Sequence, residues 1–208
     1  MLADDSASLW AALERAGGGR ICVIADNAGR ELLPDLVLID HLLDSGPASQ
    51  VVLYVKPQPY YVSDATMTDV LATLERLRAA PSAHGHAIGR RLHHAMASGA
   101  FVVRTHPFFS APLPFHDIPA DLRAELSGAT MTILKGDLNY RRLVGDQLWP
   151  PTTPFTATTD HFPTSVTALR TLKSDVVTGI DVTTVARLDG TEPAWRTSGR
   201  HAVIQVRL

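Results

Sequence analysis

The sequence predicts an α/β fold, a three-layer α/β/α sandwich built around a largely parallel sheet. Short apolar runs typical of buried strands alternate along the chain with segments whose apolar residues recur at helical spacing. This alternation favours parallel strands covered by helices on both faces, because each pair of parallel strands needs a crossover connection. The 208 residues suit one domain with a sizeable core, so residues 1–208 are interpreted as a single unit.

The expected elements follow one another in a regular order. An N-terminal helix around Leu9 and Leu13 is expected to end at the glycines 17–19. Two proline-rich stretches, 107–119 and 150–159, are expected to be surface loops. The predicted strands are 20–25, 50–56, 101–103, 129–135, 166–172 and 201–206. The other predicted helices are 31–43, a segment around 70–77, 84–97 and 138–144.

Composition excludes several classes of protein. The formal net charge of −2 gives no overall field that would attract nucleic acid or an anionic membrane. No apolar run approaches the roughly 20 residues that span a bilayer, and the first residues do not resemble a secretory signal. The lone Cys22 lies in an apolar run and is expected to be a buried small hydrophobe. We expect a cytoplasmic protein without nucleic-acid or membrane partners, and the oligomeric state stays open.

Polar clusters follow several of the predicted strands. Asp26 and Asn27 come directly after the first strand, and Asp64 lies beyond the second. Ligands bind beyond the carboxyl ends of strands in such sheets, and neighbouring strand ends meet at one edge. Two carboxylates and an amide oxygen suit a hard divalent cation such as Mg²⁺ or Mn²⁺. Basic side chains that can hold an anion beside this metal are Lys135, Arg141, Arg170 and Lys173.

Each cluster alone also has a simpler interpretation. The turn at Asp26 and Asn27 is usually only a turn and helix cap, and Asp137 is expected to be the N-cap of its helix. Arg170 and Lys173 can be solvated charges on a strand. Only the combination of clusters at strand ends favours a metal site beside a cationic clamp, which is what phosphoryl transfer requires.

Four segments together resemble the damage-control phosphatase family, also described as domain of unknown function 89. They are 26–32 (DNAGREL), 55–64 (VKPQPYYVSD), 135–141 (KGDLNYR) and 170–173 (RTLK). The Arg-Thr-x-Lys signature of the last segment is similar to that of the third subfamily, the group of acidic residue methyltransferase and sugar phosphate phosphatases. Members of the family usually carry a substantial helical region before the first motif, and here that motif begins at Asp26. The resemblance therefore implies the core domain without most of that region.

The resemblance also implies site residues and an activity. It implies that Asp26, Asn27 and Asp64 bind the metal and serve catalysis, and that the cofactor is Mn²⁺, Co²⁺ or Mg²⁺. It implies hydrolysis of small phosphate esters, among them sugar phosphates such as fructose 1-phosphate, in the removal of damaged metabolites. The implied substrate-binding residues are Glu31, Asp137, Leu138, Asn139, Tyr140, Arg141, Arg170 and Lys173.

Two rival functions remain open. A methyltransferase that uses S-adenosylmethionine is one, but that cofactor usually needs a glycine-rich turn after the first strand, whereas Gly17–Gly19 precede it. A catalytically silent binding domain is the other. A zinc site formed by the histidines of 84–94 is disfavoured, because adjacent His93 and His94 face different directions on a helix.

Two expectations concern individual side chains. Asp64 is expected to be unpaired except by the metal, so that its removal relieves repulsion with Asp26. Arg170 and Lys173 are three residues apart, so both can approach one phosphate only if the strand bends or ends near Thr171. Arg170 is then expected to brace the loop through a carboxylate, with Asp137 as the candidate.

Overall fold

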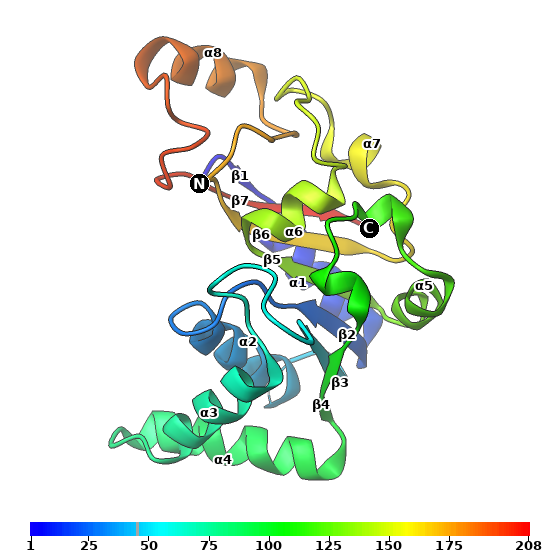
Figure 1. Ribbon diagram of the computed structural model, residues 1–208, viewed down its shortest axis with the longest axis vertical. Helices are drawn as coiled ribbons and strands as arrows, with labels where there is room; N and C mark the ends of the chain where they lie inside the picture. Colours follow the sequence, from blue (N-terminus) through cyan, green and yellow to red (C-terminus); the bar gives the residue numbers. More distant parts are fainter. Residues whose placement is uncertain (45) are drawn as a thin grey trace.

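A computed structural model describes residues 1–44 and 46–208 and contains one seven-stranded sheet. The strand order is β1-β7-β6-β5-β2-β3-β4, and β7 is antiparallel to β6 while every other neighbouring pair is parallel. The largely parallel α/β architecture predicted from the sequence is therefore confirmed (Figure 1). The strands are β1 (Ala3–Asp4), β2 (Gly19–Ile24), β3 (Ala48–Val55), β4 (Phe101–Thr105), β5 (Met131–Lys135), β6 (Val166–Thr171) and β7 (Ala202–Arg207).

Two hydrophobic clusters lie on opposite faces of the sheet. Ile21 and Val23 of β2 pack into one cluster, and the alternate residues Cys22 and Ile24 pack into the other. Because both faces are buried, the strand is apolar throughout, as the run of hydrophobic residues indicates. The first cluster contains side chains from α1 (Ser6–Ala16), α2 (Leu32–Asp44), α3 (Met67–Arg78) and α4 (Ala83–Ser98). The second contains side chains from α5 (Ala120–Ser127), α6 (Gly136–Leu143), α7 (Phe155–Thr159) and α8 (Val182–Thr191).

Several elements were not predicted from the sequence. The stretch 107–119 includes two short 3₁₀ helices, η1 (Pro107–Ser110) and η2 (Phe115–Asp117), and the stretch 150–159 includes α7. These helices are short, so they carry little periodic signal. In α8, β-branched threonines and valines weaken the helical signal, and Asp181 caps the helix by accepting from the backbone N–H groups of Thr183 and Thr184. The two-residue β1 and the eight-residue α5 were also not predicted.

The connections around β2 and β5 create the crevice that holds the site. These strands are neighbours in the sheet. The helix after β2, α2, lies on one face, whereas the helix after β5, α6, lies on the other (Figure 1). Chain segments that depart toward opposite faces leave a gap beyond the carboxyl ends of the two strands, where ligands bind in open α/β sheets.

Within residues 1–44 and 46–208, no helix combines the length and the apolar character needed to cross a bilayer.

Candidate active site

Asp26 occupies the centre of this crevice, just beyond β2. Asp26 is 6% exposed. Gly136, the first residue of α6, has φ = +86°, and a Cβ atom there would overlap the Asp26 carboxylate. Burial raises the pKa of Asp26 to about 6; the Lys56 ammonium opposes this rise, and the carboxylates of Glu31 and Asp64 add to it. A buried carboxylate beside two others favours a cation as its neighbour.

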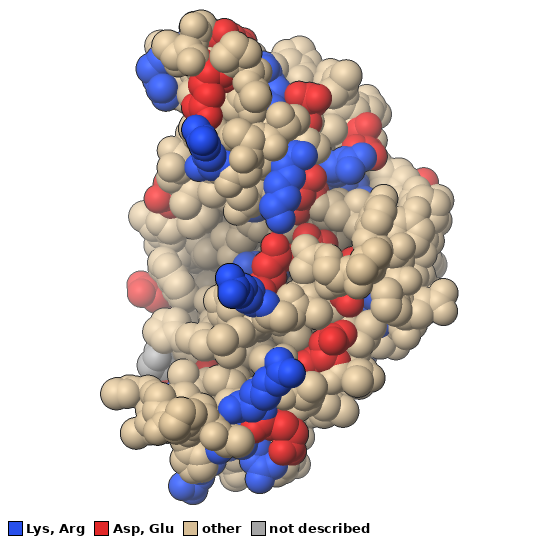
Figure 2. All heavy atoms as spheres, turned by 60° about the vertical axis from the view of Figure 1, so that its left-hand side comes forward, with Lys and Arg blue, Asp and Glu red and all other residues tan. Residues whose placement is uncertain are grey.

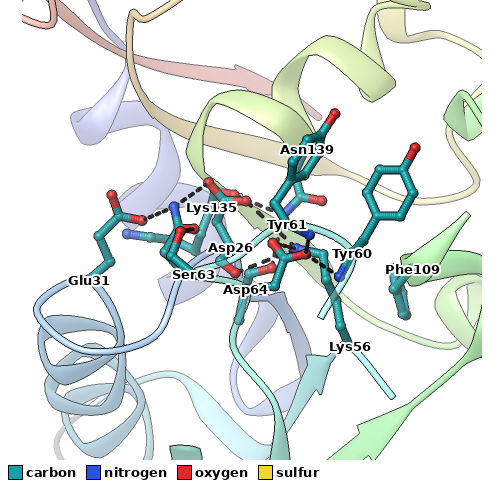
Figure 3. A network of polar contacts seen from close by, with 12 residues as sticks. Asp26, Glu31, Lys56, Tyr60, Tyr61, Ser63, Asp64, Phe109, Lys135 and Asn139 are labelled. Atoms are coloured by element: carbon teal, nitrogen blue, oxygen red, sulfur yellow. Dashed lines mark hydrogen bonds and ion pairs between the residues drawn. The ribbon is translucent and has the colours of Figure 1, made fainter. Parts of the chain in front are cut away.

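Lys56 lies between the two predicted metal-ligand carboxylates. It is 2% exposed, and its Nζ lies 2.7 Å from Asp64 Oδ1 and 3.8 Å from Asp26 Oδ1. The other oxygen of Asp64, Oδ2, accepts the backbone N–H groups of Tyr60 at 2.7 Å and Tyr61 at 2.6 Å (Figure 3). The expectation that Asp64 has no partner other than a metal is therefore wrong, because a lysine and two amides already contact it.

Asn27 connects the first motif to Glu31 and to the loop before Asp64. Its Nδ2 donates to Asp26 Oδ2 at 3.1 Å and to Glu31 Oε2 at 2.8 Å. Its Oδ1 accepts the Ser63 hydroxyl at 2.7 Å, and the backbones of Asn27 and Asp64 form an isolated β-bridge. The structure therefore brings Asp26, Asn27, Glu31 and Asp64 together at one edge of the sheet (Figure 3).

The donor set suits a hard divalent cation. In the part of the chain that the structure describes, no three His, Cys, Asp or Glu side chains converge to hold a metal ion. A metal at this edge would need another donor beside the two carboxylates, and the Asn27 amide is the neighbouring side chain. Its Nδ2 faces Asp26 and its Oδ1 faces Ser63, so the amide would have to rotate to offer its oxygen to a cation. All three donors are oxygen atoms, as Mg²⁺ and Mn²⁺ prefer. Burial is the main cause of the raised pKa of Asp26, and the neighbouring carboxylates of Glu31 and Asp64 add to it.

The Arg-Thr-x-Lys segment meets α6 on the other side of the crevice. β6 ends at Thr171, so Lys173 lies beyond the strand, as its spacing from Arg170 required. Arg170 is 3% exposed, and its Nε donates to Asp137 Oδ1 at 2.8 Å, which confirms the predicted brace. The same oxygen accepts the Lys173 N–H at 3.1 Å, and Lys173 Nζ lies 3.4 Å from Glu31 Oε1. Lys173 and Glu31 are each about half exposed at the mouth of the site.

The four basic side chains expected to form an anion clamp all have protein partners. Lys135 Nζ lies 2.7 Å from the buried Asp35 carboxylate. Arg141 forms two hydrogen bonds of 2.7 and 2.8 Å with Asp146, and Arg170 holds Asp137. Each of them would therefore have to leave or share its carboxylate partner to hold an anion, and their role as an anion clamp stays a prediction. Lys173 is half exposed, and its ion pair with Glu31 is the longest of the four. It is therefore the side chain placed to exchange its carboxylate partner for an anion.

The segment after β5 has mixed roles. Asn139 is 1% exposed and donates to the carbonyls of Ala25 at 3.0 Å and Lys135 at 2.8 Å, so it joins the ends of β2 and β5. Tyr140 is fully buried, and the Arg170 guanidinium lies 4.2 Å from its ring centroid. These two side chains support the site from within the protein. Leu138 lines a second cavity together with Tyr60 and Tyr61. Asp137 is not the N-cap of α6, which begins at Gly136 and has Lys135 at its N-cap.

Sequence reasoning missed the role of Lys56. The available signal was a lysine at the end of the apolar run 51–55, since a charged side chain there must be buried and needs a partner.

Acidic and basic side chains also meet around a hollow on the face drawn in Figure 2. A pocket of about 180 Å³ bounded by Glu31, Asp137 and Lys173 lies at this crevice.

Comparison with known proteins identifies the family. A sequence model described as "Damage-control phosphatase ARMT1-like domain" matches residues 1–188. The curated relatives named "Damage-control phosphatase ARMT1" include one from Danio rerio, 37% identical over 99% of this chain and 48% of the relative. Another, from Homo sapiens, is 33% identical over 99% of this chain and 49% of the relative.

The chain thus spans about half the length of these curated relatives. The crystal structure of a domain-of-unknown-function-89 protein from Pyrococcus horikoshii is similar in fold, with a TM-score of 0.50 at 20% identity over 84% of this chain and 46% of that one. The extent of the family match, together with relatives more than 30% identical, leads to one conclusion: this chain belongs to the ARMT1-like damage-control phosphatase family.

Proposed function

We propose that this chain is a divalent-metal-dependent phosphatase that hydrolyses small phosphate esters. The observation that carries the proposal is the convergence of two buried carboxylates, Asp26 and Asp64, with the Asn27 amide at the crevice between β2 and β5. The relatives' name, damage-control phosphatase, supports the same reaction class. In this reaction a P–O bond breaks, water supplies the oxygen that the phosphorus gains, and a proton passes to the departing alcohol.

The residues of the chain supply binding and charge around the phosphate. Asp26, Asn27 and Asp64 would hold Mn²⁺, Co²⁺ or Mg²⁺. A bound divalent cation polarises phosphoryl oxygens and lowers the pKa of water. Lys173 is the ammonium that can turn from Glu31 to a phosphate oxygen, since both side chains are exposed and 3.4 Å apart. The backbone at the start of α6 also favours negative charge near Gly136.

We infer the substrate class more narrowly as sugar phosphates such as fructose 1-phosphate, in line with the family resemblance. The crevice supports small substrates, because the pocket beside Lys173 holds only about 180 Å³. Such a volume is below the usual range of pockets for drug-sized ligands.

The test is a turnover assay on the purified chain with p-nitrophenyl phosphate and with fructose 1-phosphate. After exhaustive chelation, phosphate release should fall to the buffer rate, and added Mn²⁺, Co²⁺ or Mg²⁺ should restore it. Calorimetric titration with Mn²⁺ gives an independent readout, in which the wild type binds the ion and Asp26→Asn binds it at least tenfold more weakly.

Three outcomes separate the rival functions. Full activity after chelation would contradict metal dependence. Formation of S-adenosylhomocysteine from S-adenosylmethionine, without phosphate release, would support the methyltransferase. Tight Mn²⁺ binding with no turnover of any ester would support a silent binding domain.

A further inference from the structure

Two tyrosines stand beside the candidate site with nothing from the protein covering them fully. Tyr60 is 40% exposed and Tyr61 is 54% exposed. Their rings meet edge to face, with centroids 4.8 Å apart and planes inclined at 80°. Figure 3 shows both rings on the side of Asp64 away from Glu31. In the part of the chain that the structure describes, no residue forms a hydrogen bond with either hydroxyl.

The backbone of this aromatic pair is fixed to a predicted metal ligand. The N–H groups of Tyr60 and Tyr61 donate to Asp64 Oδ2 at 2.7 and 2.6 Å. The Ser110 hydroxyl holds the same loop by donating to the Gln58 carbonyl at 2.9 Å. Because backbone atoms make the contacts with Asp64, the rings are positioned beside the site without themselves holding the carboxylate.

The tyrosines form one wall of a cavity of about 120 Å³. Other walls are Leu138 and Arg141 of α6, Leu113 of the loop after η1, and Asp146. Arg142 fixes the Leu113 wall, since its buried guanidinium donates to the carbonyl of Leu113 at 2.7 Å and to that of Phe108 at 2.9 Å. Its charge also lies 4.5 Å from the Phe108 ring centroid. This wall of the cavity is thus held by contacts within the protein.

This cavity differs in the charge of its lining from the pocket beside Lys173. Arg141 is paired with Asp146 through two hydrogen bonds. Arg142 also lines the cavity, but its guanidinium is engaged by backbone carbonyls and by the Phe108 ring. An aromatic wall whose charged side chains are already engaged suits an uncharged group that offers a flat or C–H face and a few hydroxyls. The pocket on the other side of Asp26 contains Arg30 and Lys173, which suit the charged phosphate.

We propose that Tyr60 and Tyr61 form the wall of a leaving-group subsite that selects phosphate esters whose alcohol carries a ring. The inference rests on the proposed phosphatase function, and it adds the residues that read the part of the substrate without phosphorus. A cavity of about 120 Å³ accepts a single ring and excludes a nucleoside-sized group from full burial. An unbranched alcohol leaves the aromatic wall uncovered and gains less from it.

Binding of two non-hydrolysable probes, phenylphosphonate and methylphosphonate, tests the subsite by calorimetry in Mn²⁺ buffer. The wild type should bind the phenyl probe about tenfold more tightly. The double variant Tyr60→Ala, Tyr61→Ala should reduce this preference to about twofold or less, while its affinity for methylphosphonate stays within about twofold of wild type. The backbone donors to Asp64 remain in the variant, so the phosphate side of the site should be intact.

Two control variants sharpen the test. The double variant Tyr60→Phe, Tyr61→Phe should keep the phenyl preference, because the hydroxyls have no described protein partner. Val62→Ala truncates a fully exposed side chain of the same loop and should also keep the preference. A wild type without a phenyl preference, a double alanine variant that retains it, or an equal loss of both probes would each overturn the subsite.

A parallel assay of phenyl phosphate hydrolysis distinguishes this failure from failure of the proposed function. A tyrosine-dependent phenyl preference without turnover would refute the phosphatase and leave the subsite supported. Turnover of phenyl phosphate without a tyrosine-dependent phenyl preference would support the phosphatase and refute the subsite.

Discussion

Lys56 is a buried cation on which two buried carboxylates depend. A charged group in a protein interior needs an oppositely charged partner and hydrogen bonds. Removal of one partner leaves the other charge buried and unpaired. Here Asp64 is the nearer partner at 2.7 Å, and Asp26 lies farther away at 3.8 Å. Part of the negative charge of the site is therefore balanced within the protein itself. On the proposed function, a divalent cation would share these oxygens with the Lys56 ammonium.

Asp64→Ala is therefore expected to destabilise the domain as well as to abolish turnover. The change leaves Lys56 without its nearer carboxylate and leaves the Tyr60 and Tyr61 amides without their acceptor. Loss of one partner of a buried pair costs about 3–5 kcal/mol, measurable by urea unfolding in chelator. Asp64→Asn keeps an oxygen acceptor and should lose less stability. An alanine variant as stable as the wild type would restore the simpler interpretation, in which Asp64 serves the metal alone.

Lys173→Ala should lower kcat/KM by on the order of 10²-fold, the size expected when a preorganised charge is removed from a transition state. The Lys173 ammonium is half exposed and pairs with Glu31, whereas the contact of this residue with Asp137 is made by its backbone N–H. Mn²⁺ affinity should change little, since an ammonium is not a ligand. Lys173→Arg keeps the charge and should lose less activity. Normal kcat/KM in the alanine variant would remove Lys173 from the site, and a lost Mn²⁺ response would assign it to the metal centre.

At the scale of elements, the close approach of β2 and α6 sets the position of the site. Gly136 begins α6 in a left-handed conformation directly against the Asp26 carboxylate. Asn139, one turn further on, donates to the carbonyls at the ends of both strands. The helix is thereby fixed to the sheet at the point where Asp26 emerges.

A comparison of Gly136→Ala with Gly99→Ala separates the effect of this close packing against Asp26 from the effect of backbone strain. Both glycines are left-handed, with φ of +86° and +79°, so each alanine should cost about 1–2 kcal/mol from backbone strain. A Cβ at Gly99 has no atom within 4 Å, whereas one at Gly136 overlaps Asp26. Only Gly136→Ala should therefore weaken Mn²⁺ binding, by at least tenfold in calorimetry. Equal Mn²⁺ affinity in the two variants would show that Asp26 tolerates displacement.

At the scale of the whole molecule, the spacing of apolar residues in the sequence predicted the strands and most of the helices. It did not predict the ion pairs between side chains that shape the candidate site. All six predicted strands are present, because strands buried on both faces carry continuous apolar runs. The predicted site residues Asp26, Asn27 and Asp64 meet because the sheet order places their strands side by side. Charge partners such as Asp35 for Lys135 and Asp146 for Arg141 were not predictable, since they depend on rotamers and helix packing that no sequence period records.

The face opposite α2 carries a histidine pair that should make global stability depend on pH. His161 stacks on His116 with ring centroids 3.5 Å apart, and both of its ring nitrogens are buried without a hydrogen-bond partner in the described chain. The pKa of His161 is lowered to about 4, mainly by burial; His116, Arg123 and Arg207 contribute to this decrease, and Asp160 opposes it.

The unfolded chain therefore binds a proton at His161 at a higher pH than the folded protein does, with an unfolded pKa near 6.5. The stability that His161 contributes by staying neutral is fully present above about pH 6.5 and is lost as the pH falls toward 4. Urea unfolding of the metal-free protein at pH 7.5 and pH 4.5 should show a larger loss for the wild type than for His161→Phe, which keeps a flat ring but cannot take up a proton. The exposed His93, changed to Gln, should leave the wild-type loss unaltered. If wild type and His161→Phe lose the same stability between these pH values, the acid sensitivity of the fold originates in its carboxylates and not in the histidine stack.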